Sequence, residues 1–167
     1  YLTETQKDAL VQLTTITPYV TGKYMILDTS TRRNLELAET LREKNKKGSL
    51  LWILDKTTTA MGARLLRSFL EQPLIDKAEI TKRQEAVQTF VNSAIEREEI
   101  REYLNPVYDL ERIISRIANK TANPRDLIAF KNSLSMLPHI KRILDSFENP
   151  LLNKINQDMD ALLDITE

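Results

Sequence analysis

The chain has 167 residues, with 24 basic and 24 acidic side chains, 41% hydrophobic residues and no cysteine. A chain of this size buries about 70% of the surface that its unfolded form exposes, so it can form one globular domain without disulfides or metals. The lack of cysteine excludes a disulfide scaffold, a thiol nucleophile and cysteine-based zinc sites. With no apolar run near the roughly 20 residues of a membrane span, we expect no membrane association and a cytoplasmic location.

The N-terminal region is predicted to contain one small β-hairpin. In the stretch ITPYVTGKYMILD, residues 16–28, β-favouring side chains flank Thr21 and Gly22. A lone hairpin is only marginally stable, so we expect it to pack on helices. Asp28 should then cap a short helix that opens at Thr29.

Helical periodicity dominates the rest of the chain. Apolar residues recur at i, i+3, i+4 and i+7, which predicts amphipathic helices whose apolar stripes face the core. We therefore predict a mainly α fold, a bundle-like array of about seven helices with short connections and one small β-hairpin near the N-terminus. The stripes run from Met61 to Leu70, Ile80 to Ala94, Leu110 to Ala118, Leu127 to Leu137, and Leu151 to Leu162.

Asparagine–proline pairs are predicted to mark three helix starts. Asn suits the N-cap, and Pro suits the first helical position because its missing N–H has no intrahelical partner there. Asp126 lies three residues after one such Asn, where its carboxylate can complete a capping box. Pro73 and Pro138 are expected to end or break helices. The pairs are Asn105–Pro106, Asn123–Pro124 and Asn149–Pro150.

No group of residues in the sequence has the pattern of an active site. The three glycines, Gly22, Gly48 and Gly62, do not have the spacing of a P-loop or of a dinucleotide-binding turn. The single histidine, His139, lies in an apolar helical sequence and is interpreted as an ordinary helix residue. We expect no enzyme activity and no cofactor in this chain.

The arginines are more informative. Arg112 and Arg116 are four residues apart on one predicted helix, a repulsive placement unless each has an acidic or carbonyl partner. We interpret these guanidinium groups, with Arg64, Arg67, Arg32 and Arg33, as ties between helices; contact with phosphate or with a neighbouring domain is the alternative. Trp52 is interpreted as a core anchor, with a docking surface as the alternative.

One segment is strongly basic. We interpret residues 42–49, REKNKKGS, as a solvated loop closed by Gly48, and weak phosphate contact is the alternative. The zero net charge of the whole chain argues against a dedicated nucleic-acid module. The basic side chains of the segment are Arg42, Lys44, Lys46 and Lys47.

Three strings together resemble one known family. They are LDTSTRRNLEL at 27–37, SLLWILDKTTTAMGARLLRSFLEQP at 49–73, and YDLERIISRIANKTANPRDL at 108–127. In order and spacing they are similar to the core, or lever, domain (domain III) of the bacterial MutS family of DNA mismatch repair proteins. The departures are mild: Phe69 stands where many members have Trp, and Ala63 where Gly or Ser is usual.

The resemblance implies that residues 1–167 form a single domain, the first part of that core domain. Since the chain starts with Tyr1, we expect it to be part of a longer protein whose mismatch-reading, clamp and ATPase domains are absent here. The resemblance implies that such a core connects mismatched-DNA binding by the clamp to ATP binding and hydrolysis. ATP and Mg would belong to the parent's ATPase domain. The implied partners are other domains of the same polypeptide and, through the parent, mismatched duplex DNA; the parent is expected to be a homodimer.

The resemblance also suggests residues for structural and inter-domain contacts rather than for catalysis. A stand-alone helical protein–protein interaction module is the main alternative, and a weak DNA-binding domain that uses the basic segment is a third. The residues expected to make structural and inter-domain contacts are Arg32, Arg33, Asn34, Asp55, Arg64, Arg112, Arg116, Arg125 and Asp126.

Overall fold

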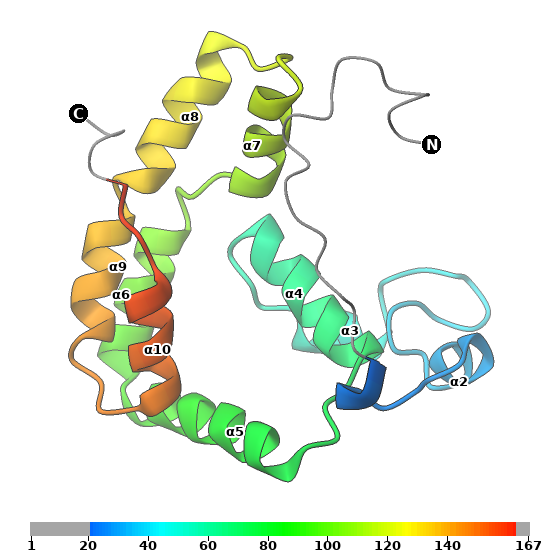
Figure 1. Ribbon diagram of the computed structural model, residues 1–167. Coiled ribbons are helices and arrows are strands. Elements are labelled where there is room, and N and C mark those ends of the chain that lie inside the picture. Colours follow the sequence, from blue (N-terminus) through cyan, green and yellow to red (C-terminus); the bar gives the residue numbers. More distant parts are fainter. Residues whose placement is uncertain (1–20, 163–167) are drawn as a thin grey trace.

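The computed structural model describes residues 21–162, and this part of the chain is built from helices (Figure 1). None of these helices is long and apolar enough to cross a membrane. In chain order the elements are the 3-10 turn η1 (Thr21–Lys23), α2 (Thr29–Asn34), α3 (Leu50–Leu54), α4 (Ala60–Glu71), α5 (Lys77–Asn92), α6 (Ala94–Leu104), α7 (Leu110–Ala118), α8 (Pro124–Leu134), α9 (Leu137–Leu144) and α10 (Pro150–Asp158).

The predicted β-hairpin is wrong. Among residues 21–162 there is no β-strand, and Thr21–Lys23 is a single 3-10 turn. Tyr24 instead forms an isolated antiparallel bridge with Leu74, and the Met25 N–H donates to the Pro73 carbonyl at 2.8 Å. The backbone that was expected to pair with its neighbour in sequence thus pairs with the segment after α4, a partner that local alternation cannot reveal. Residues 16–20, the expected first arm, lie outside the described part of the chain.

Most predicted helix starts are confirmed. The Asp28 carboxylate accepts a hydrogen bond from the Thr31 N–H at 2.6 Å and caps α2. Asn149 caps α10 by accepting from the Leu151 and Leu152 N–H groups at 3.0 and 3.2 Å. Asn123 caps α8 in a complete capping box. These devices are local, which is why the sequence reveals them.

The start predicted at Asn105–Pro106 is wrong. Asn105 ends α6, with helical backbone angles and its N–H bonded to the Arg101 carbonyl at 3.0 Å. Helix α7 begins after Asp109, whose carboxylate accepts from the Arg112 N–H at 3.4 Å. An Asn–Pro pair is compatible with a helix end as well as a start, because Pro commonly follows a helix that stops.

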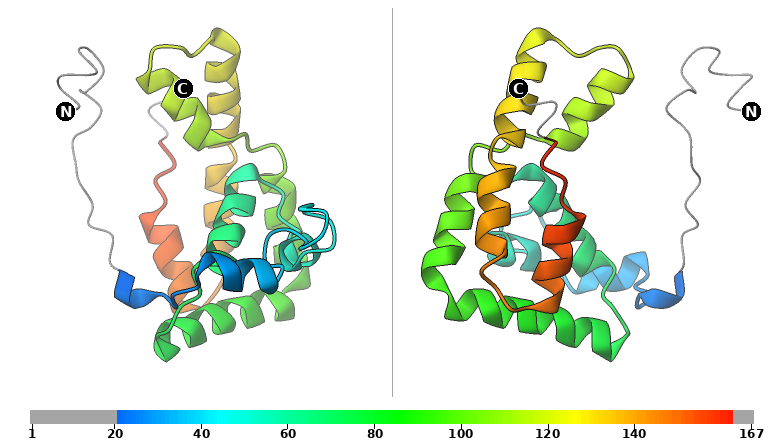
Figure 2. Two further views of the ribbon diagram at one scale, coloured as in Figure 1. Left: turned by 90° about the vertical axis from the view of Figure 1, so that its right-hand side faces the viewer. Right: turned by 60° about the vertical axis from the view of Figure 1, so that its left-hand side comes forward.

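Four helices surround the main apolar core. Helices α6, α9 and α10 lie side by side, and α5 runs across one end of them (Figures 1 and 2). Phe90 of α5 packs edge-on against Phe147 of the α9–α10 loop, with ring centroids 5.2 Å apart. The buried residues of this core are Ala86, Ile100, Ile140, Ile143, Leu144, Phe147 and Leu152.

Several predicted apolar stripes do form helices but are only partly buried. On α7, Ile113 is 5% exposed whereas Ile114 is 53% exposed. On α5 the residue in the core is Ala86, and Val87 remains 61% exposed. Trp52, expected as a core anchor, is 47% exposed, so that interpretation is wrong. Periodicity identifies the helix, but which side is covered depends on neighbours that the sequence does not specify.

Helices α7 and α8 pack on each other at the end of the bundle opposite α5 (Figures 1 and 2). The fully buried Ser133 hydroxyl of α8 donates to the Ala129 carbonyl at 2.7 Å and accepts from the Tyr108 N–H at 2.9 Å. This pair of bonds fixes the residue that immediately precedes Asp109. The start of α7 is therefore anchored to α8.

The core predicts a clear contrast between two identical substitutions. Ile140→Ala, at a position 4% exposed, should lower the free energy of unfolding by about 2–5 kcal/mol because it leaves a cavity. Ile95→Ala, at a position 80% exposed, should change it by about 0.5 kcal/mol or less. Urea unfolding followed by circular dichroism measures both. Similar losses for the two variants would contradict the assigned core.

Candidate functional site: an arginine cluster

Several arginines singled out in the sequence meet on one side of the molecule, where α4 approaches the α7–α8 pair. We define the arginine cluster as four arginines and the three carboxylates among them. Its members are Arg64 of α4; Asp109, Glu111, Arg112 and Arg116 at the start of or on α7; and Arg125 and Asp126 of α8.

Arg64 makes the central contact of the cluster. Its two terminal nitrogens donate to the two carboxylate oxygens of Asp109, each at 2.7 Å, in a bidentate arrangement. Its Nε donates to Glu111 Oε2 at 3.1 Å, and Nη2 also contacts that oxygen. A planar guanidinium matches a carboxylate in this geometry, which a lysine cannot reproduce. We call this set of bonds the Arg64 clamp; it joins residues 45 and 47 positions apart in sequence.

Asp109 has two roles at once. It is the N-cap of α7 and also the carboxylate that Arg64 holds. Hydrogen bonds from Arg64, and then from the Arg112 N–H, lower the pKa of the Asp109 carboxyl below its ordinary value. Hydrogen bonds to Asp109, and then to Glu111, raise the pKa of Arg64. Both groups are therefore charged throughout the physiological pH range.

A second ion pair extends the cluster from α7 to α8. Arg116 Nη1 donates to Asp126 Oδ1 at 2.5 Å. The other oxygen of Asp126 accepts from the Asn123 N–H at 3.1 Å, and the Asp126 N–H donates to the Asn123 side chain at 3.0 Å, which completes the capping box. Asp126 thus stabilises the first turn of α8 and fixes Arg116 at the same time.

A groove of about 480 Å³ lies over the α7–α8 contact. Asp109, Arg112, Arg116, Arg125 and Asp126 are among its lining residues. Arginine remains protonated in proteins, so these side chains can bind carboxylate, phosphate or carbonyl oxygens but cannot transfer protons. Within residues 21–162, no three His, Cys, Asp or Glu side chains come together as a metal site. The guanidinium groups of the cluster therefore suit contact with carboxylate, phosphate or carbonyl oxygens.

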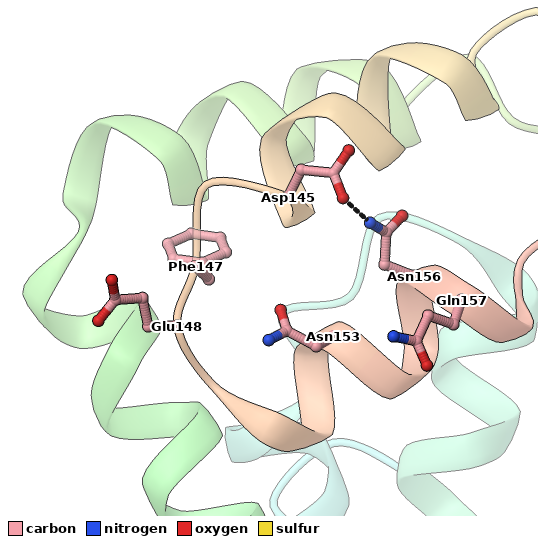
Figure 3. Close-up of a pocket in the computed structure, with 6 residues that line it drawn as sticks. All are labelled: Asp145, Phe147, Glu148, Asn153, Asn156 and Gln157. Atoms are coloured by element: carbon pink, nitrogen blue, oxygen red, sulfur yellow. Dashed lines mark hydrogen bonds between the residues drawn. The ribbon is translucent and has the colours of Figure 1, made fainter.

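A second polar pocket, of about 440 Å³, lies between α10 and the loop before it (Figure 3). Asp145 accepts a hydrogen bond from the Asn156 amide there, whereas the Glu148 carboxylate points away (Figure 3). Lys141 Nζ donates to the Asn156 and Met159 carbonyls at 2.5 and 2.6 Å. It thus provides a hydrogen-bond donor for carbonyl groups at the C-terminal end of α10. The polar groups here hold the end of α10 in place and do not converge on a shared point.

The other predicted site residues lie away from the cluster. Arg32 donates from Nε to the Leu27 carbonyl at 2.9 Å, and Arg33 and Asn34 are exposed on α2. Asp55 follows α3 and accepts from Lys46 Nζ at 2.6 Å and from the Thr57 hydroxyl at 2.6 Å. These two bonds, with that from Lys46 the larger cause, lower the Asp55 pKa to about 2.

The basic segment is an exposed loop that turns at Gly48, where φ is +95°. Lys46 forms an ion pair with Asp55 at 2.6 Å, although its side chain is still 53% exposed. Arg42, Lys44 and Lys47 are exposed. The segment therefore presents less free positive charge than its composition suggests.

Comparison with known proteins identifies the family. The family model described as MutS domain III matches residues 30–166. The chain belongs to the MutS domain III family. A DNA mismatch repair protein MutS of Lachnoclostridium phytofermentans is 63% identical over 165 residues, which are 99% of this chain and 18% of that protein. MutS of Clostridium novyi is 48% identical over 99% of this chain, which corresponds to 18% of that protein. MutS of Caldanaerobacter subterraneus is 49% identical over 100% of this chain, which corresponds to 19% of that protein.

The match to MutS domain III includes the whole arginine cluster, since residues 64–126 lie within the matched range. The chain spans less than a fifth of the length of these MutS relatives. The structural and inter-domain roles expected for the nine residues named from the sequence stay predictions. What the structure adds is which of them meet: Arg64, Arg112, Arg116, Arg125 and Asp126 do so, and Arg32, Arg33, Asn34 and Asp55 do not.

Sequence reasoning missed two members of the cluster. Asp109 directly precedes Leu110, the first residue of a strong apolar stripe, and this N-cap signal could have identified it. Glu111 is one of many surface carboxylates, and no local signal marks it as a partner of Arg64.

Removing Asp126 should destabilise the chain by removing the capping box. Asp126→Ala should lower the free energy of unfolding by about 0.5–2 kcal/mol. Arg116→Ala removes the ion pair but leaves the cap, and because Arg116 is 50% exposed it should cost less, about 0–1 kcal/mol. Urea unfolding of both variants separates the two roles. An unchanged midpoint for Asp126→Ala would contradict the capping role.

Stability should fall in acid through Asp55 and Asp109. A carboxyl whose pKa is lowered on folding contributes stability that is present above its unfolded pKa of about 3.9 and is lost as pH falls through the folded value. The loss should therefore occur below about pH 4. Urea unfolding from pH 6 to 2 should show a shallower pH dependence for Asp55→Asn and Asp109→Asn. Glu85→Gln, a surface change away from both, is the control; equal slopes in all variants would contradict the assignment.

Proposed function

We propose that this chain is the first part of the core domain of a MutS-type mismatch repair protein, and that it couples distant parts of that protein to each other. Membership of the MutS domain III family supports the role in DNA mismatch repair. In this role residues 1–167 act as one structural domain. The parent polypeptide would bind mismatched DNA and hydrolyse ATP elsewhere, with this domain between the two sites.

The observation that carries the coupling role is two groups of ion pairs that α7 connects and that together join three helices. The Arg64 clamp connects α4 to the start of α7, and Arg116 with Asp126 connects α7 to α8. Asp109 and Asp126 in these pairs also cap helices, so displacing one helix changes the end of the next. Coupling needs elements that both sites can bias, and a chain of shared contacts provides them.

The partners follow from this role. Other domains of the same polypeptide would contact the exposed arginines, and mismatched duplex DNA would act through the parent's clamp. ATP and Mg would bind in the parent's ATPase domain, and the parent would form a homodimer. No reaction is assigned to the side chains of this chain, because the cluster is built from guanidinium groups and their carboxylate partners.

A protein–protein interaction module is the second candidate function, and one observation favours it. Trp52, Ile53 and Leu54 of α3 are 47%, 58% and 47% exposed. Adjacent exposed apolar side chains of this kind mark protein contact surfaces. In the core-domain role the same surface would contact another part of the polypeptide; in the alternative it would bind a separate protein.

The core-domain role predicts a selective defect in the full-length MutS protein that contains this chain. Arg112→Ala and Arg116→Ala should weaken the effect of mismatched duplex on ATP turnover more than they weaken ATP binding. The physical reason is that the cluster transmits a bias and does not contact nucleotide. Steady-state ATP turnover with and without heteroduplex, and equilibrium ATP binding, measure the two quantities.

Arg142→Ala is the matched control for this experiment. Arg142 lies on α9, is 70% exposed, and its contact with Glu99 is 3.8 Å long. It should leave both quantities unchanged. Equal losses of DNA response and ATP binding in the cluster variants, or no loss of either, would refute the coupling role.

A further inference from the structure

The described residues form two parts that differ in how much apolar surface each part buries. We call residues 21–75, which contain α2, α3 and α4, the arm, and residues 76–162, which contain α5 to α10, the frame (Figure 1). Within the described residues, every side chain of the main apolar core belongs to the frame. The arm buries Leu37 and Leu51 and joins their segments by a backbone hydrogen bond of 2.9 Å.

Three guanidinium groups connect the arm to the frame. Arg64 of the arm binds Asp109 and Glu111 through the Arg64 clamp. Arg101 of α6 donates to the Lys56 carbonyl of the arm at 2.9 Å, and the Arg83 guanidinium of α5 lies 3.9 Å from the centre of the Phe69 ring of the arm.

No apolar side chain of α4 is fully buried. Leu65, next to Arg64, is 55% exposed, and Phe69 is 38% exposed. The Arg64 side chain is 40% exposed, Asp109 17% and Glu111 68%. Partly exposed ion pairs are weak and are screened by salt, whereas apolar burial is not. The joint between arm and frame should therefore separate under conditions in which the core of the frame stays intact.

Asp109 has an alternative partner already in place. Arg112, one turn along α7, lies with Nε 3.3 Å from Asp109 Oδ2, the oxygen that Arg64 also binds at 2.7 Å. If Arg64 leaves, Arg112 can neutralise the carboxylate without any change in the backbone. Asp109 would also keep its N-cap bond to the Arg112 N–H. The N-terminal end of α7 therefore loses little stability when Arg64 leaves.

We propose that the Arg64 clamp is a reversible switch between a closed arrangement, in which Arg64 and Arg112 both contact Asp109, and an open one, in which Arg112 alone contacts Asp109 and the arm is released from the frame. This inference rests on the proposed coupling function and supplies the two-state element that coupling requires. In the open state the Arg64 guanidinium is free to bind another carboxylate or a phosphate.

The switch is tested by distance measurement on the 167-residue chain, which has no native cysteine to interfere with labelling. Spin labels at Ala60→Cys and Lys154→Cys, both exposed, report the arm–frame distance; labels at Glu102→Cys and Lys154→Cys report a distance within the frame. Arg64→Gln should add a second arm–frame distance to the pulsed EPR distribution and leave the frame distance unchanged. High salt should shift the unsubstituted chain in the same direction.

Two further variants make the result decisive. Asp109→Asn keeps an N-cap acceptor but lacks the carboxylate, so it should open the arm as Arg64→Gln does. Arg112→Gln removes the second partner of Asp109 but leaves the Arg64 clamp, so it should leave the arm closed. An unchanged arm–frame distance in Arg64→Gln and Asp109→Asn would overturn the proposal, as would frame distances that broaden equally or an arm that opens in Arg112→Gln. These measurements contain neither DNA nor ATP, so failure of the switch is distinguishable from failure of coupling in the full-length protein.

Discussion

The bidentate contact between Arg64 and Asp109 sets the geometry on which the rest of the arginine cluster depends. An N-cap carboxylate must lie at a fixed place relative to the first turn of its helix, so α7 decides where Asp109 stands. Arg64 then fixes α4 to that place through two bonds of 2.7 Å. Because the Tyr108 N–H is held by the buried Ser133 hydroxyl, the position of α4 is tied through α7 to α8.

Apolar burial stabilises the frame, whereas charged side chains connect the arm to the frame. The close-packed main apolar core lies between α5, α6, α9 and α10 and makes the frame stiff. The contacts that join the arm to the frame are guanidinium contacts with long side chains, which bind specifically but contribute little net stability at a partly exposed site. Such a division permits a change in the arrangement of the two parts without loss of either fold.

The features that could be predicted from the sequence are those that depend on residues close together in the chain. The helical class and the caps at Asp28, Asn123 and Asn149 could be derived, since a cap and the N–H groups that it accepts lie within three residues. The hairpin failed because the backbone of Tyr24 pairs with Leu74, after α4. For the site, the sequence indicated that Arg112 and Arg116 need partners. Which carboxylate Arg64 would find could not be derived, because its partners are 45 and 47 residues away.

The presence of both Arg64 and Arg112 at one carboxylate gives the cluster its functional meaning. A single arginine with a single carboxylate would make a fixed tie, and its loss would leave a charge without a partner near a helix end. Here Asp109 has one partner on its own helix and one on a different part of the chain, at 3.3 and 2.7 Å. Release of Arg64 therefore leaves Asp109 with one guanidinium partner instead of none. A neighbouring domain can then displace Arg64 without leaving a carboxylate unpaired at a helix end, and a structural domain can respond to its neighbours only if some of its contacts can be released in this way.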